Sequence, residues 1–258
     1  MRMGKPLGGK VALITGATRL AGLGAAIADA LARAGADIGL GYFRAYDRQQ
    51  PWGVKDSEPQ ELLAHLRTLG GRAVGFEVDL SRPAGPAALF ALVQEALGPI
   101  HILVNNAAYS AAVPIEQLTA EALDLHYTVN LRATALLCAA FAQHCPSARG
   151  GRIINLTSGQ GVVPMPAELA YAATKGGIDA LTLSLSVAVA GKGITVNAVD
   201  PGPTDTGWLS RELSASLLAK APMGRLGTPQ DAAKLVAFLA SEEAGWITGQ
   251  ILRSRGAS

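Results

Sequence analysis

The sequence predicts an α/β protein of one domain, in which helices cover both faces of a doubly wound parallel sheet of about seven strands. Three observations support this prediction. Short apolar runs alternate with longer segments in which apolar residues recur at helical spacing. Two of the runs, at 102–104 and 152–156, are apolar nearly throughout, as buried parallel strands must be. No linker divides the 258 residues, so we expect one domain over 1–258.

Each expected element follows from one of two patterns. The first strand, 10–16, is an apolar run that ends in glycine, and the helix 23–35 shows helical spacing before a glycine stop. The same patterns predict strands at 36–42, 73–78, 100–105, 151–157 and 194–199, with 249–252 as the candidate for a last strand. They also predict helices at 58–69, 86–97, 119–145, 167–190 and 229–241. The polar segment 44–59 fits neither pattern and is too long for an ordinary connection, so we interpret it as an insertion.

Charge and cysteine content exclude several classes of protein. The net charge is only +2, and no Lys/Arg run suggests a nucleic-acid or membrane surface. No apolar run reaches the ~18 residues needed to span a bilayer, and 1–10 lacks the apolar core of a signal peptide. Cys138 and Cys145 lie about two turns apart on one expected helix, where they cannot form a disulfide. We therefore expect a reduced, cytoplasmic setting, a small-molecule partner and no metal.

A glycine-rich segment, 15–24, follows the first expected strand. Its glycines allow a sharp turn and the close approach of a pyrophosphate, which would lie on the free N–H groups of the next helix. Such a segment is also found in purely structural turns. Its position between a strand and a helix, with two more strand–helix units behind it, favours nucleotide binding.

Two arginines indicate which dinucleotide is bound. Arg19 in the loop and Arg44 just past the second strand could both reach a ribose 2′-phosphate. The segment 41–43 lacks the acidic residue that would hold a bare 2′-hydroxyl. NADP(H) is therefore favoured over NAD(H), with the alternative that both arginines are solvated surface charges.

Polar residues also follow the third and fourth expected strands. The ends of these strands form the edge where an open α/β sheet binds ligands. There Asp79 either binds the adenine amino group or caps its own turn, and the segment 105–107 lies beside it. Asn130 is a poor helix former on a helix face expected to be buried, which suggests that it holds a water behind Lys175.

Tyr171 and Lys175 are the residues most indicative of chemistry. They lie four apart on an expected helix and therefore on one face. A free tyrosine titrates near ~10, so acid–base work near neutral pH would need tyrosinate favoured by about 4 kcal/mol. A neighbouring ammonium supplies much of this stabilisation. Ser158 precedes Tyr171 by thirteen residues.

In this order the residues resemble the short-chain dehydrogenase/reductase family, from residue 10 to about 252. The matching pieces are 15–24, Asp79, 105–107, Asn130, Ser158, Tyr171, Lys175, Asn197, 201–202, 225–229 and 247–250. Spacing and the 225–229 segment indicate the branch similar to 3-oxoacyl-(acyl-carrier-protein) reductases. This branch includes reductases of many different ketones, so the resemblance does not by itself fix the substrate. The resemblance implies a Rossmann-type fold.

The family resemblance also implies roles for individual residues. Ser158 would bind the substrate carbonyl and Tyr171 would donate the proton. Lys175 would bind the nicotinamide ribose and lower the pKa of Tyr171, and Asn130 would support a water relay, which completes a catalytic tetrad. The implied cofactor-binding residues are Gly16, Thr18, Arg19, Gly22, Leu23, Gly24, Arg44, Asp79, Leu80, Asn106, Ala107, Ala108, Tyr171, Lys175, Pro201, Gly202, Thr204 and Thr206.

Three features depart from the family pattern. Five residues separate Gly16 from Gly22 where three are usual, which leaves the phosphate contacts open. The insertion 44–59 either covers the cofactor or forms a subunit contact. The chain continues as 253–258 where many relatives carry an acidic-Gly-Gly sequence that supports tetramer packing.

The segment 206–222 is amphipathic and follows the expected nicotinamide-binding turn, so we expect it to form a substrate lid. Trp208, Leu209 and Leu213 would contact substrate together with Ser158 and Tyr171. An apolar or mixed small ketone fits this lid better than a sugar phosphate.

Two other functions stay open. One is an NAD-dependent alcohol dehydrogenase that works oxidatively, and the other is a nucleotide sensor without redox chemistry, which the intact tetrad disfavours. The helices 119–145 and 167–190 are apolar on more than one face, so we expect a homotetramer, with a dimer as the alternative.

Overall fold

The computed structural model describes residues 4–146 and 150–257, and within these ranges it contains one seven-stranded sheet. The strand order is β3-β2-β1-β4-β5-β6-β7, and every neighbouring pair is parallel. The strands are β1 (Val11–Thr15), β2 (Asp37–Tyr42), β3 (Ala73–Glu77), β4 (Ile102–Asn105), β5 (Gly151–Leu156), β6 (Ile194–Asp200) and β7 (Ile251–Arg253). The chain reverses its direction of winding between β1 and β4, which places a topological switch point at their carboxyl ends.

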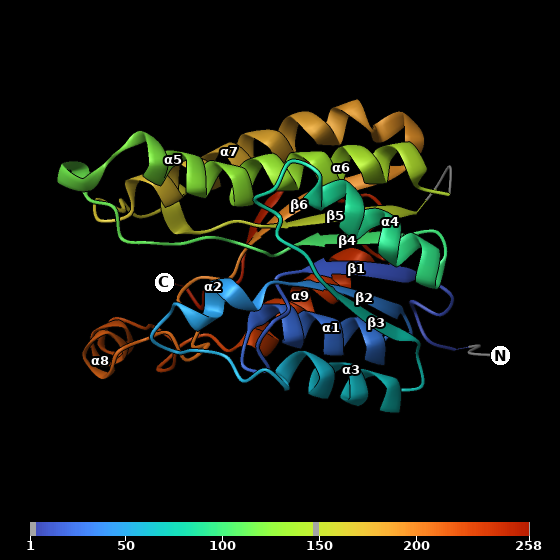
Figure 1. Cartoon of the computed structure of the whole chain (residues 1–258), viewed down its shortest axis with the longest axis horizontal. Helices are drawn as coiled ribbons and strands as arrows, with labels where there is room; N and C mark the ends of the chain where they lie inside the picture. Colours follow the sequence, from blue (N-terminus) through green and yellow to red (C-terminus); the bar gives the residue numbers. More distant parts are fainter. Residues whose placement is uncertain (1–3, 147–149, 258) are drawn as a thin grey trace.

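Helices cover both faces of the sheet, which confirms the doubly wound α/β fold. In Figure 1, α4, α6 and α7 lie on one face and α1, α3 and α9 lie on the other. The helices are α1 (Leu23–Arg33), α2 (Arg44–Arg48), α3 (Glu58–Thr68), α4 (Gly85–Leu97), α5 (Ala120–His126), α6 (Ala133–His144), α7 (Leu169–Ala188), α8 (Arg211–Ala219) and α9 (Pro229–Ala240). In the parts of the chain that the structure describes, no helix has the length and apolarity to cross a membrane.

The core consists of two apolar layers, one on each face of the sheet. Ile14 and Val104 belong to the layer beneath α1 and α9, whereas Leu13 and Leu103 belong to the layer beneath α4 and α6. All four side chains are fully buried, and each contributes about 1.5–3 kcal/mol relative to an exposed position. Successive residues of each strand point to opposite faces, so one strand contributes to both layers.

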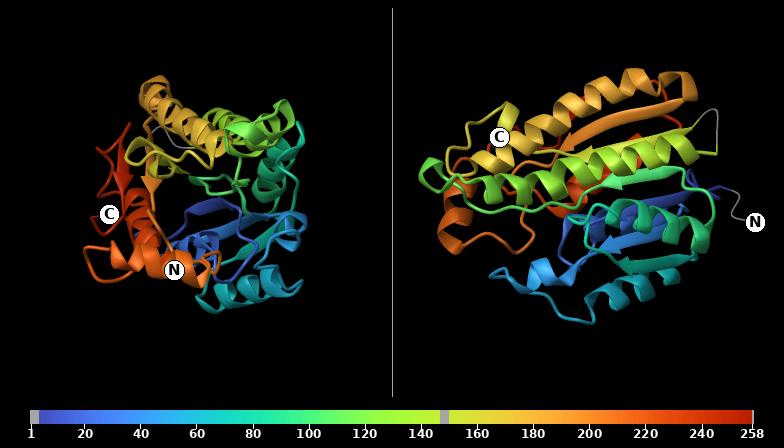
Figure 2. Two further views of the ribbon diagram at one scale, coloured as in Figure 1. Left: turned by 90° about the vertical axis from the view of Figure 1, so that its left-hand side faces the viewer. Right: turned by 45° about the horizontal axis from the view of Figure 1, so that its top comes forward.

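Two predicted segments differ in detail from the structure. The expected helix 119–145 consists of α5 and α6 joined by a π-helical turn, Tyr127–Arg132. The insertion 44–59 begins with the short helix α2, which has too few residues to show a helical period. In Figure 1 and in the right view of Figure 2, α2 and α8 lie beyond the sheet rather than on its faces, near the carboxyl ends of the strands.

Candidate active site

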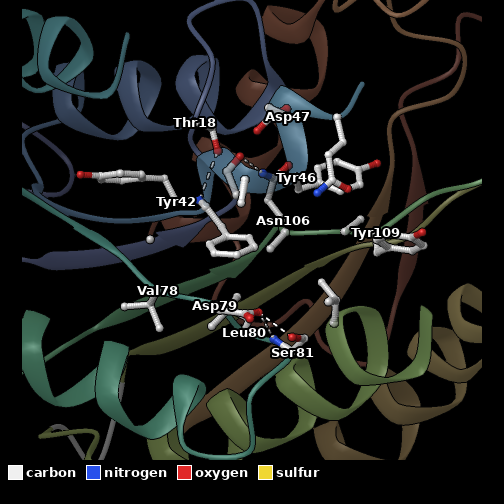
Figure 3. Close-up of a pocket in the computed structure, with 18 of the residues that line it drawn as sticks. Thr18, Tyr42, Tyr46, Asp47, Val78, Asp79, Leu80, Ser81, Asn106 and Tyr109 are labelled. Atoms are coloured by element: carbon white, nitrogen blue, oxygen red, sulfur yellow. Dashed lines mark hydrogen bonds between the residues drawn. The ribbon is translucent and has the colours of Figure 1, made fainter. Parts of the chain in front are cut away.

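A cavity of about 430 Å³ lies at the carboxyl edge of the sheet, next to the switch point. In Figure 3 Tyr46 and Asp47 line it from one side, and Val78 and Asp79 line it from the opposite side. Nine of the predicted cofactor residues line this cavity: Gly16, Thr18, Leu23, Asp79, Leu80, Asn106, Ala107, Ala108 and Thr206. Nine others lie outside its lining: Arg19, Gly22, Gly24, Arg44, Tyr171, Lys175, Pro201, Gly202 and Thr204.

The glycine loop between β1 and α1 has the shape that a pyrophosphate needs. Gly16 has φ +72°, and a Cβ there would lie 2.6 Å from the Ala107 Cα. A Cβ on Gly24 would lie 2.6 Å from the Gly16 carbonyl oxygen, so neither position accepts a side chain. Gly22 is the N-cap residue of α1 and offers no capping side chain, which leaves N–H groups for an anion. These residues fit a dinucleotide cofactor.

Asn106 connects the ends of β1 and β4. Its Nδ2 donates to the carbonyl oxygens of Thr15 (2.8 Å) and Gly16 (3.0 Å). The Thr15 Oγ1 accepts from the backbone N–H groups of Asn106 and Ala107, at 3.0 Å each. The side chain of Asn106 therefore holds the glycine loop in place at the cavity wall.

Asp79 caps its own turn, one of the two roles open from the sequence. Its Oδ1 accepts from the Ser81 N–H (2.9 Å) and hydroxyl (2.6 Å), and its Oδ2 is 3.3 Å from the Arg82 Nε. The residue also lines the cavity. Contact with an adenine amino group stays a prediction.

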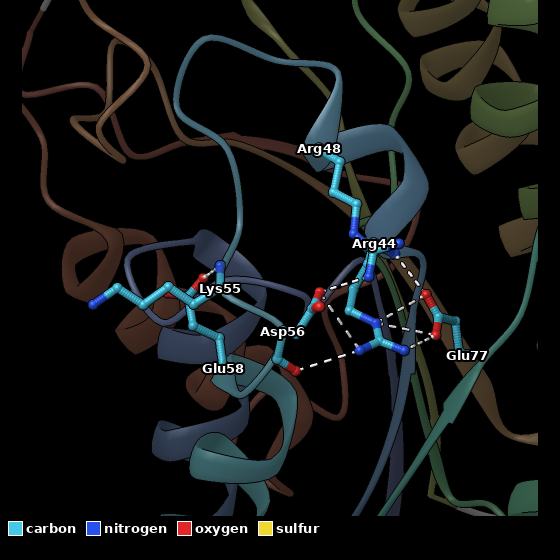
Figure 4. Close-up of polar contacts among 6 residues, drawn as sticks. All are labelled: Arg44, Arg48, Lys55, Asp56, Glu58 and Glu77. Atoms are coloured by element: carbon cyan, nitrogen blue, oxygen red, sulfur yellow. Dashed lines mark hydrogen bonds and ion pairs between the residues drawn. The ribbon is translucent and has the colours of Figure 1, made fainter.

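Both arginines contact other residues of the protein, and a contact of either with a 2′-phosphate stays a prediction. Figure 4 shows the Arg44 guanidinium between Glu77 and Asp56. Its Nε lies 3.1 Å from both Glu77 carboxylate oxygens, and this pairing lowers the pKa of Glu77. Arg19 donates from Nη2 to the Thr206 carbonyl oxygen (2.6 Å) and lies over the Trp52 ring, 5.3 Å from its centroid.

The insertion contributes cavity residues that sequence reasoning missed. The Tyr46 hydroxyl donates to the Ser110 carbonyl oxygen and accepts from the Ser110 N–H, both at 3.2 Å. The Tyr46 ring lies 5.5 Å from that of Tyr109, which follows β4. The insertion thus spans the cavity. The aromatic residues within its polar sequence were the feature that could have indicated a role in binding.

Asp47 is a buried acidic residue of the same insertion. Only 8% of it is exposed, and burial raises the pKa of its carboxyl although Trp52 Nε1 donates to it (3.2 Å). It lines the cavity, whereas the sequence argument considered acidic residues only at 41–43. The short helix α2, which follows β2, places the Asp47 carboxylate at the cavity.

Ser158, Tyr171 and Lys175 meet at the same edge of the sheet. Tyr171 and Lys175 lie one turn apart on α7, and the Lys175 Nζ is 5.5 Å from the centroid of the Tyr171 ring. Lys175 is 3% exposed, and its Nζ donates to the Leu156 carbonyl oxygen at 2.7 Å. Ser158 follows β5 and forms a hydrogen bond with the Tyr171 phenol.

The predicted lowering of the Tyr171 pKa is wrong for the chain alone. Burial raises this pKa because it disfavours the phenolate, and the hydrogen bond with Ser158 only partly opposes the effect. Glu168, Tyr46 and Asp200 raise it further. Burial likewise lowers the pKa of Lys175 to about 8, which Asp179 opposes. The phenol is therefore protonated at neutral pH, which is the form that a proton donor requires.

Asn130 lies in the π-helical turn and is 1% exposed. Its Oδ1 accepts from the Tyr109 N–H (2.7 Å), and its Nδ2 donates to the Tyr109 carbonyl oxygen (2.9 Å) and to the Thr174 Oγ1 (3.0 Å). The buried amide thus joins the loop after β4 to α7. π-helical turns often mark functional sites. A water relay through Asn130 stays a prediction.

The predicted lid leaves its apolar side open. Trp208 is 44% exposed and Leu213 is 39% exposed, and neither they nor Leu209 line the cavity. The Trp208 Nε1 donates to the Thr204 carbonyl oxygen (3.0 Å), which anchors the lid to the turn after β6. Thr206 alone of this segment reaches the cavity.

Comparison with known proteins gives the family. A family model described as enoyl-(acyl carrier protein) reductase matches residues 16–256. The chain belongs to the short-chain dehydrogenase/reductase family. An uncharacterized oxidoreductase of Bacillus subtilis, YjdA, is 46% identical to this family member over 96% of each chain.

Two further relatives are similar over nearly their whole length. The 3-oxoacyl-[acyl-carrier-protein] reductase FabG of Vibrio cholerae is 35% identical, with 97% of each chain covered. A blue fluorescent protein from a metagenomic library, solved in complex with NADPH, is 33% identical with a TM-score of 0.88, over 97% of this short-chain dehydrogenase/reductase and 98% of that chain.

Proposed function

We propose that this oxidoreductase reduces a ketone to a secondary alcohol with NADP(H), and that Tyr171 donates the proton. The observation that supports this most is the placement of Ser158, Tyr171 and Lys175 at the sheet edge that also bears the cavity beside the glycine loop. A protonated, half-buried phenol beside a serine hydroxyl suits proton transfer to a carbonyl oxygen.

Each side chain then has a defined task. When bound, the reduced nicotinamide supplies a hydride to the carbonyl carbon. The Ser158 hydroxyl donates a hydrogen bond to the carbonyl oxygen and so orients it, while Tyr171 transfers its phenolic proton to that oxygen. The Lys175 ammonium stabilises the phenolate that remains, and it binds the ribose of the cofactor.

The proposed preference for NADP(H) depends on Arg19, which donates to the cavity residue Thr206, and on Arg44, which follows the cavity residue Phe43. A 2′-phosphate would compete with Glu77 for the Arg44 guanidinium, which forms bidentate pairs with phosphates equally well. The solved relative that holds NADPH supports the same choice.

NAD(H) is the second candidate because Asp47 lines the cavity, where a carboxylate could accept from a ribose hydroxyl. Initial rates with NADPH and NADH on one ketone decide between them. We expect a higher kcat/KM with NADPH. Equal or better kcat/KM with NADH would contradict this preference and favour the oxidative alcohol dehydrogenase.

For the substrate we propose an apolar or mixed ketone, with a 3-oxoacyl thioester among the candidates. The exposed Trp208 and Leu213 on the lid are available to close over such a molecule. A panel of ketones, including an acyl thioester, assayed with NADPH tests this. We expect turnover that falls when Trp208 or Leu213 is replaced by Ala. No turnover of any carbonyl or alcohol with either cofactor would favour a nucleotide sensor instead.

A further inference from the structure

Asp200, the last residue of β6, is a buried carboxylate that the proposed reaction does not use. It is 1% exposed. Its Oδ1 accepts from the Gly202 N–H at 2.9 Å, and its Oδ2 accepts from the Arg255 Nη1 at 2.9 Å. The Ser254 N–H donates to its backbone carbonyl oxygen at 2.8 Å. A carboxylate with this little water contact must be paired or it destabilises the fold.

Arg255 reaches Asp200 by passing between two turns of the site. A Cβ on Gly159, the residue after Ser158, would lie 2.2 Å from the Arg255 Nη1. A Cβ on Gly202, which has φ +64°, would lie 2.8 Å from the Arg255 Cγ. The Arg255 side chain therefore packs against a glycine in each turn, at positions with no room for a larger residue. It is only 10% exposed.

The electrostatic surroundings connect this ion pair to Tyr171. Around the phenol, Glu168 lies at the start of α7, Lys175 one turn after Tyr171, Tyr46 on α2 and Asp200 at the end of β6. Asp200 also faces Asp179, the acidic residue that raises the pKa of Lys175. The Arg255 guanidinium therefore offsets an anion within reach of the proton-donating group.

We propose that Arg255 is a positioning residue of the redox site. Through Asp200 it fixes the turn after β6, which we assign to the nicotinamide, against the turn after β5, which presents Ser158. The inference rests on the proposed function, because the two turns matter together only if a nicotinamide and a carbonyl meet between them. The arginine lies two residues beyond β7.

The first test measures ligand binding without turnover. In R255M we expect the affinity for NADPH to fall about tenfold or more, because the turn under the nicotinamide loses its support. The affinity for adenosine 2′,5′-bisphosphate, which lacks the nicotinamide half, should stay within about twofold of wild type. The matched control is R253M, at an exposed arginine two residues earlier, which should change neither affinity.

The second test uses pH profiles. In R255M the unpaired Asp200 carboxylate raises the pKa of Tyr171. The acid limb of kcat/KM for alcohol oxidation, which needs the phenolate, should therefore move to higher pH. D200N removes that anion, so the double variant D200N/R255M should return the limb toward the wild-type position. R255K keeps the charge and should hold the limb in place while kcat falls, because an ammonium lacks the planar fork of a guanidinium.

Thermal unfolding of the apoprotein separates folding from positioning. Leaving Asp200 unpaired in R255M should lower Tm by about 6 °C or more, and adding D200N should recover part of this loss. Wild-type binding of NADPH by R255M, an equal loss of both ligands, or an unshifted acid limb would overturn the proposal. If wild type binds NADPH but turns over no carbonyl or alcohol, the proposed function fails, whereas the ligand comparison still decides whether Arg255 fixes the nicotinamide turn.

Discussion

Tyr171 shows how strongly a single residue depends on its surroundings. Its spacing from Lys175 predicts their common face, and the structure places the ammonium 5.5 Å from the ring centroid. The pKa of Tyr171, however, is determined mainly by burial, and residue spacing does not predict burial. Desolvation disfavours both the phenolate and the ammonium, so the pKa of Tyr171 rises while the pKa of Lys175 falls to about 8.

At the same scale, Arg44 is expected to set the choice of cofactor. R44Q removes the guanidinium that a 2′-phosphate would bind, so KM for NADPH should rise about tenfold or more while KM for NADH changes little. Steady-state kinetics with both cofactors check this. K55Q, at an exposed lysine of the same insertion, serves as control. An equal effect of R44Q on both cofactors would exclude the proposed contact.

Among the elements, α2 has the most unexpected role. The sequence indicates an insertion because its composition breaks the alternation of strands and helices. The position of α2 over the cavity depends on a contact between Tyr46 and Ser110, 64 residues apart, and no local pattern encodes such a contact. By contrast, the glycine loop and the Tyr171–Lys175 pair are recognisable because the spacing of each is fixed within one turn or one helix. The same limit applies to Asp200 and Arg255, 55 residues apart.

The span of α2 across the cavity should slow the passage of the cofactor. Y46F removes both hydrogen bonds to Ser110 and retains the ring, so the rate constants for NADPH association and dissociation should both rise several-fold while Kd changes less. Stopped-flow fluorescence measures both. Rates that match wild type would mean that the contact does not gate the cavity.

The start of α9 allows a pH prediction. Asp231 completes a capping box with Thr228 and accepts two hydrogen bonds from Arg225 (2.6 and 3.0 Å), so its pKa lies below the ordinary value. D231N should reduce the unfolding free energy by about 1 kcal/mol at pH 7. Because the folded-state pKa is depressed, this contribution is present above the unfolded pKa of about 3.9 and disappears as pH falls through the folded value.

Urea unfolding of wild type and D231N at pH 7 and at about pH 2 checks this difference. D124N, at an exposed position on α5, is the control and should show little change at either pH. A difference between D231N and wild type that persists undiminished at the low pH would show that the carboxylate charge is not its cause.

On the scale of the whole molecule, several apolar side chains remain exposed on the face formed by α5, α6 and α7. Leu136 is 43% exposed, Leu183 is 59% exposed and Val187 is 76% exposed. Such a face favours association with a second copy, in line with the apolar excess of these helices in the sequence. We therefore propose a homotetramer, with a dimer as the alternative.

V187E would place a charge in this face and should convert the assembly to smaller species at micromolar concentration. Light scattering after size-exclusion chromatography gives the mass directly. L92E introduces the same charge at an exposed leucine of α4 and should leave the mass unchanged. A wild-type protein that is monomeric would contradict the proposed assembly.

The most direct test of the account is the effect of Y171F on turnover and on NADPH binding measured side by side. Removing only the phenolic oxygen should lower kcat by about 10²- to 10⁴-fold, because the proton donor is lost. The Kd for NADPH should stay within about twofold of wild type, and Y127F, at a tyrosine 47% exposed, should retain full activity. A Y171F enzyme that reduces ketones at the wild-type rate would contradict the assignment of Tyr171 as the proton donor.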